Sequence, residues 1–127
     1  MARILVVDDN KDLLEVIREM LAEAGHTATL ATDALQAAQV LEHERFDVAL
    51  IDIFMPVVDG LQLLHQWRGD HPTMGLIAMS GGGTTAEGLD ALTAASAFGA
   101  LTLRKPIHAD TLAEAITTVL PRSRRRE

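Results

Sequence analysis

The sequence contains no cysteine, so disulfide bonds, thiolate metal sites and thiol-based catalysis are all excluded. Basic residues are scarce outside the C-terminal end: residues 1–120 hold seven Lys and Arg against seventeen Asp and Glu, a net charge of −10. Such an acidic chain lacks the basic face that contacts with nucleic-acid phosphates require. There is also no apolar run long enough for a signal peptide or a membrane span. We therefore expect a cytoplasmic protein that binds neither nucleic acid nor membrane.

What the 127 residues do contain is a regular alternation of two patterns. Short apolar runs, rich in β-branched residues, alternate with segments whose apolar residues recur at helical spacing. The expected strands are 4–7, 27–31, 48–51, 74–79 and 101–103, and the expected helices are 11–24, 34–44, 59–68, 85–98 and 110–120. Asp33 is the predicted N-cap of the second helix, and Gly69 the predicted end of the third. We expect one domain over residues 1–120, followed by a basic, flexible tail over 121–127.

Five strand–helix units in succession predict an α/β fold with a parallel sheet and helices on both faces. Right-handed crossovers leave few topologies. The usual five-stranded solution is the doubly wound, flavodoxin-like sandwich, with strand order 2-1-3-4-5 counted along the chain. Ligands of such sheets bind outside the carboxyl ends of the strands, so the residues that follow the strands are the candidates for function.

Polar residues follow four of the five predicted strands. Asp8 and Asp9 follow the first, Asp52 ends the third, Ser80 the fourth and Lys105 the fifth. Three carboxylates at neighbouring strand ends repel one another unless a cation is present, and hard oxygen ligands suit Mg²⁺. Together with a lysine and a hydroxyl, they are equipment for handling a phosphoryl group.

These residues resemble the receiver domains of two-component response regulators over essentially the whole chain. The matching motifs are "ILVVDDN" at 4–10, "LIDIFMPVVDG" at 50–60, the Ser80-Gly81 step, and Lys105-Pro106. Each motif is weak alone, but the four in order, each at a strand end, are specific.

The resemblance implies a role for each matching position. Asp52 would accept a phosphoryl group from a sensor histidine kinase or a histidine phosphotransfer protein. Mg²⁺ would be held by Asp9, Asp52 and the backbone carbonyl of Phe54, with Asp8 acting through water. Lys105 and Ser80, with the adjacent Gly81, would contact the phosphoryl oxygens, and Pro106 would follow Lys105 through a cis peptide. The chain would signal through a downstream protein target and would not turn over an external substrate.

The chain departs from the family pattern at one switch position. Receivers usually carry an aromatic residue three positions before the lysine, and Thr102 stands there. Two other interpretations stay open: a receiver-like binding module that no longer depends on phosphorylation, and the detached receiver of a DNA-binding regulator. A Mg²⁺-dependent phosphatase is disfavoured because Phe54 occupies the position where such enzymes place a second acid.

Overall fold

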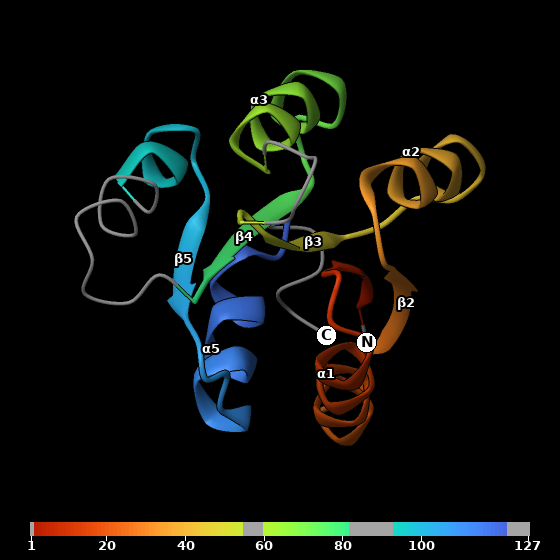
Figure 1. The fold of residues 1–127 in the computed structure, drawn as a ribbon, viewed down its shortest axis with the longest axis vertical. Helices are drawn as coiled ribbons and strands as arrows, with labels where there is room; N and C mark the ends of the chain where they lie inside the picture. The colour runs from red at the N-terminus through yellow and green to blue at the C-terminus, as the bar shows by residue number, and fades with distance from the viewer. Residues whose placement is uncertain (1, 55–59, 82–92, 122–127) are drawn as a thin grey trace.

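The computed structural model describes residues 2–54, 60–81 and 93–121 (Figure 1). Its strands are β1 (Arg3–Val7), β2 (Thr27–Ala31), β3 (Val48–Asp52), β4 (Gly75–Ser80) and β5 (Leu101–Arg104). Its helices are α1 (Lys11–Glu23), α2 (Ala34–His43), α3 (Gly60–Asp70) and α5 (Ala109–Val119), and residues 93–97 are also helical. Residues 85–92 of the helix predicted over 85–98, the predicted start at Asp59 and the tail after Pro121 lie outside the described residues, and Phe98, the predicted end of that helix, lies in a turn.

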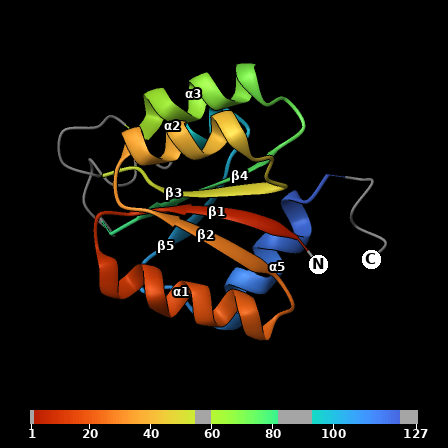
Figure 2. The ribbon, with the colours of Figure 1, turned by 90° about the vertical axis from the view of Figure 1, so that its right-hand side faces the viewer.

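All five strands are parallel and lie in the order β2-β1-β3-β4-β5. The predicted flavodoxin-like topology is therefore confirmed. Side chains along a strand alternate between the two faces of the sheet, so Ile4 and Val6 pack on one face while Leu5 and Val7 pack on the other. The first face is covered by α1 and α5 and the second by α2 and α3, as Figure 2 shows. No side chain of β3 reaches solvent on either face, because all five of its residues are buried.

Side-chain caps mark where α1 and α2 begin. Asn10 caps α1 by accepting a hydrogen bond from the backbone N–H of Leu13 at 3.1 Å, and Asp33 caps α2 by accepting from Gln36 at 2.8 Å. The predicted N-cap at Asp33 is thus confirmed. The predicted stop at Gly69 is wrong, because α3 continues through it to Asp70. Glycine in a helix lowers stability by about 1 kcal/mol relative to alanine, which the packing of Leu64 and Trp67 offsets here.

Gly75 sets the distance between the sheet and α5. A Cβ atom on Gly75 would lie 2.3 Å from the backbone oxygen of Val119, far inside van der Waals contact. Only a residue without a side chain lets the end of α5 approach the start of β4 this closely. Within the described ranges, no helix is both long and apolar enough to cross a bilayer.

Candidate functional site

Asp52 is the last residue of β3 and reaches the carboxyl end of the sheet with only 5% of its surface exposed. Each carboxylate oxygen has a partner. Oδ1 accepts a hydrogen bond from the backbone N–H of Phe54 at 2.9 Å, and Oδ2 accepts one from Lys105 Nζ at 3.1 Å. A buried carboxylate is stable only with such partners, so the site is built to hold a charge at this position.

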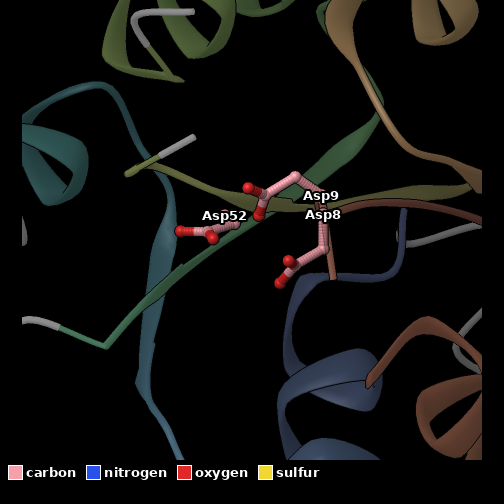
Figure 3. Close-up of side chains that lie close together, drawn as sticks. All are labelled: Asp8, Asp9 and Asp52. Atoms are coloured by element: carbon pink, nitrogen blue, oxygen red, sulfur yellow. The ribbon is translucent and has the colours of Figure 1, made fainter. Parts of the chain in front are cut away.

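Asp8 and Asp9 follow β1, the neighbouring strand. Asp8 is completely buried, and its Oδ1 accepts a hydrogen bond from the backbone N–H of Asn10 at 2.9 Å. Its Oδ2 lies 2.9 Å from Lys105 Nζ, an ion pair without the angles of a hydrogen bond, and has no hydrogen-bond partner among the described residues. Asp9 is exposed. In Figure 3 the carboxylates of Asp8, Asp9 and Asp52 gather in one region at the strand ends.

Lys105 lies between the two buried acids. Its side chain is 22% exposed, and its Nζ contacts both Asp8 and Asp52. Burial alone would lower the pKa of Lys105, but the contacts with Asp8 and Asp52 outweigh it, so the pKa is raised. The lysine is therefore a fixed positive charge at neutral pH. The peptide bond from Lys105 to Pro106 is cis.

The remaining candidate residues lie around this centre. Ser80 is fully buried at the end of β4, and its backbone oxygen accepts a hydrogen bond from the backbone N–H of Lys105 at 2.9 Å. A Cβ on Gly81 would lie 3.7 Å from Cδ of Lys105, so this glycine touches the lysine stem. Thr102 pairs with Ala78 in the sheet and is partly buried. Phe54, the second residue after β3, is 44% exposed, so the chain turns toward solvent there.

Gly60 was not among the residues singled out by sequence reasoning, and the structure gives it a specific task. A Cβ there would lie 2.5 Å from Cα of Ile53 and 3.1 Å from the backbone oxygen of Asp52. The start of α3 can therefore sit against the end of β3 only with glycine. The Asp59-Gly60 pair was the available signal, although Asp59 and the turn that begins at Met55 lie outside the described residues.

The acids of this site fit a divalent cation. Asp8, Asp9 and Asp52 each offer one oxygen, and the three oxygens lie within 4.8 Å of one another. The buried Oδ2 of Asp8 has spare hydrogen-bonding capacity, and an all-oxygen set with room for water suits Mg²⁺. The three carboxylates carry more negative charge than Lys105 offsets, so a cation would be held favourably.

Comparison with known proteins agrees with this arrangement. The family model of the response regulator receiver domain matches residues 4–117. The response regulator MprA of Mycobacterium tuberculosis is 37% identical over 92 residues, which cover 70% of this chain and 40% of MprA. The matched region thus spans less than half the length of that relative.

Solved receiver structures superpose over nearly all of the chain. A response regulator receiver domain from Clostridium thermocellum matches with a TM-score of 0.84 and 30% identity, covering 94% of both chains. The chemotaxis protein CheY4 of Vibrio cholerae matches with a TM-score of 0.80 and 28% identity, covering 94% of this chain and 99% of its own. With its sheet order and its acidic strand ends, this chain belongs to the response-regulator receiver-domain family.

Proposed function

We propose that Asp52 accepts a phosphoryl group from the phosphohistidine of a sensor histidine kinase or a histidine phosphotransfer protein. The observation that carries the proposal is the nearly buried Asp52 carboxylate, hydrogen-bonded to Lys105 and clustered with Asp8 and Asp9. A nucleophile in such a site is held in one orientation on a rigid strand, and this lowers the entropic cost of reaction.

The proposed step is a transfer between two covalent bonds. A carboxylate oxygen of Asp52 forms a bond to phosphorus, the phosphorus–nitrogen bond of the donor breaks, and the imidazole takes up a proton as it leaves. Asp52 then carries an acyl phosphate and has lost its own charge. Lys105 Nζ, 3.1 Å from Asp52 Oδ2 before the transfer, is close enough to turn to a phosphoryl oxygen afterwards.

The metal would be Mg²⁺, held by Asp9, Asp52 and the backbone carbonyl of Phe54, with Asp8 contributing through water. When bound, it supplies positive charge against the repulsion between the three acids and an incoming phosphoryl dianion. Asp8 has a second task, because its ion pair with Lys105 keeps the ammonium in the crevice when Asp52 is modified.

The proposed output is a change in affinity for a downstream protein. The phosphoryl group places a charge of about −1.5 to −2 beside Ser80 and Lys105, in place of the single negative charge of the Asp52 carboxylate, and the backbone of both residues joins β4 to β5. Thr102, in β5, has no ring to move inward, so the output relies on displacement of these strand ends and the segments that follow them. Thr102 is also the observation that favours the second candidate, a receiver-like binding module that works without phosphorylation.

Intact mass after incubation with a small acyl-phosphate donor tests the proposal. We expect a Mg²⁺-dependent gain of one phosphoryl group that is lost in Asp52→Asn. Asp110→Asn is the matched control, because Asp110 is an exposed acid in the first turn of α5 and should label like the parent chain. Labelling of Asp52→Asn at one site would refute the acceptor assignment. Failure of the folded parent chain to label from acyl phosphate or from a phosphorylated histidine donor would favour the binding module.

A further inference from the structure

A groove of about 430 Å³ lies at the end of the sheet opposite the acidic crevice. It is formed by residues 41–46, from the end of α2 and the loop that leads to β3, and residues 70–74, from the end of α3 and the loop that leads to β4. Phe46 and Met74 are buried and provide an apolar base. Three acids lie around them: Glu42, Glu44 and Asp70. A surface of this composition suits a ligand that combines positive charge with an aliphatic stem.

The acids of the groove are only partly neutralised by the described protein. Glu44 pairs with Arg3 at 2.5 Å, and both side chains are more than two-fifths exposed. Glu42 and Asp70 are exposed and form no ion pair with any residue that the structure describes. Arg45 is the one cationic residue in the described lining. Arg68 lies at the border of the groove, where its Nη1 donates to the backbone oxygens of Pro72 and Met74. Glu42 and Asp70 are therefore the carboxylates of the lining that are left without an ion-pair partner among the described residues.

The described part of the chain ends close to this groove, and a basic segment follows it in the sequence. The backbone oxygen of Val119, the last residue of α5, lies against Gly75, and Gly75 directly follows Met74 of the groove. Figure 2 shows the ends of α2, α3 and α5 together at the right-hand end of the molecule. After Pro121 the sequence continues Arg122-Ser123-Arg124-Arg125-Arg126. Each extended residue spans up to about 3.5 Å, so the five residues of this segment can span up to about 17 Å.

We propose that the arginine-rich segment 122–126 docks intramolecularly in this groove. Guanidinium groups would pair with Glu42 and Asp70, and the aliphatic stems would lie over Phe46 and Met74. Arginine suits both contacts, because its planar head binds a carboxylate through two hydrogen bonds while its stem covers apolar surface. Docking would hold the most basic part of the chain on its own acidic surface, where it is shielded from other polyanions.

The absence of cysteine makes a crosslinking test direct. We would introduce Ser123→Cys with Thr73→Cys, since Thr73 is exposed in the groove lining, and measure the rate of disulfide formation. The matched pair is Ser123→Cys with Thr117→Cys, since Thr117 is exposed on α5 and only six positions from Ser123. A tail without a docking site would favour the nearer Thr117. We expect the Thr73 pair to close roughly fivefold faster, because docking raises the effective concentration of the thiol there.

The charge dependence completes the test. Glu42→Gln with Asp70→Asn, or 1 M NaCl, should remove the advantage of the Thr73 pair, because ion pairs at an exposed site are screened by salt. In the chain without cysteines, replacing the four tail arginines by glutamine should shift the amide resonances of residues 42–46 and 70–74. Equal or slower closure of the Thr73 pair, with no change in those resonances, would overturn the proposal. A disulfide-linked dimer as the main product would also overturn it, by assigning the groove to the tail of a second copy.

Discussion

The two ends of the sheet handle charge in opposite ways. At the carboxyl end, Asp8 and Asp52 are buried and share a single cation, Lys105. At the amino end, the Arg3–Glu44 pair is more than two-fifths exposed on both sides. Buried charges interact strongly because little water screens them, whereas exposed pairs contribute little. The ion pairs that contribute most to stability are therefore expected at the carboxyl end of the sheet, where the phosphoryl transfer is proposed.

The two ends agree in one respect, since each requires a glycine at a close backbone contact. Gly75→Ala should have the largest effect of the changes considered, about 3 kcal/mol of unfolding free energy, because its Cβ would meet the backbone oxygen of Val119 at 2.3 Å. Gly60→Ala should cost a similar or slightly smaller amount by displacing Ile53. Urea unfolding followed by circular dichroism measures both changes.

Gly60→Ala and Gly75→Ala should differ in acyl-phosphate labelling even though both lower the free energy of unfolding by similar amounts. Gly60→Ala moves the backbone beside Asp52, so labelling of the folded fraction by an acyl-phosphate donor should fall, whereas Gly75→Ala should label normally. Gly69→Ala is the control on α3, because nothing lies within 4 Å of its Cβ, and it should stabilise the protein by about 0.5–1 kcal/mol. Equal loss of labelling in Gly60→Ala and Gly75→Ala would contradict a local role for Gly60.

Removing one cation at each end tests the contrast in charge directly. Lys105→Met leaves two buried acids without their shared partner and should lower the unfolding free energy by about 2 kcal/mol, less than for a fully buried pair because the lysine is partly exposed. Arg3→Met removes an exposed pair and a contact with the Phe46 ring, and should cost within about 1 kcal/mol. Urea unfolding with and without Mg²⁺ provides the measurement.

The metal adds a second readout to that experiment. Mg²⁺ should stabilise Lys105→Met more than the parent chain, because a divalent cation bound among the acids replaces the missing positive charge. Arg3→Met should respond to Mg²⁺ like the parent. Equal stability of Lys105→Met and Arg3→Met in the absence of metal would contradict the prediction that the buried ion pairs of Lys105 stabilise the fold more than the exposed pair of Arg3.

The smallest expected effect is on the pH dependence of stability, through His26 at the amino end of the sheet. His26 Nδ1 accepts a hydrogen bond from the backbone N–H of Ala2 at 3.0 Å. Burial and the positive charge of the chain's amino terminus lower the pKa of His26 below its ordinary 6.5, while Asp47 acts in the opposite direction. The unfolded chain then binds the proton more readily than the folded one. The contribution of neutral His26 to the free energy of unfolding is therefore fully present above pH 6.5 and is lost as the pH falls below that value.

His26→Asn should flatten this dependence, because an asparagine oxygen can accept the same hydrogen bond and does not titrate. The difference is less than about 1 kcal/mol, since solvent screens a partly exposed side chain. Thermal unfolding between pH 5 and pH 8 measures it. His108→Asn should keep the parent slope, as the His108 side chain forms no capping hydrogen bond. An unchanged slope in His26→Asn would exclude His26 as its origin.

Sequence reasoning recovered the sheet because hydrophobic periodicity is a local property. The N-cap at Asp33 followed from residues close together in the chain, and the strand order followed from the handedness of crossovers and the usual topology of five-stranded parallel sheets. What it missed depends on contacts between distant segments. Gly75 looks like an ordinary glycine until α5 is placed against it. Gly69 looked like a helix stop, but Leu64 and Trp67 on the same helix are buried in the core.

Arg68 shows the same limit at the level of hydrogen bonds. Its guanidinium lies within 3.2–3.4 Å of four backbone oxygens, those of Pro72, Met74, Phe98 and Gly99. It thus joins the end of α3 to the segment that leads into β5, which lies thirty residues further along the chain. A lone arginine near a helix end carries no such signal in the sequence. The sequence predicted that Asp8 and Lys105 follow strands at the same edge of the sheet, whereas their direct ion pair required coordinates.

The approach of Val119 to Gly75 also has a consequence for protein engineering. It leaves the end of α5 at the same edge of the sheet as Arg3, where β1 begins. A fluorescent reporter or an affinity handle fused after α5 or before β1 would therefore be separated from the acidic crevice by the full length of a strand, about 17 Å for five residues. Either fusion point should leave access to Asp52 open.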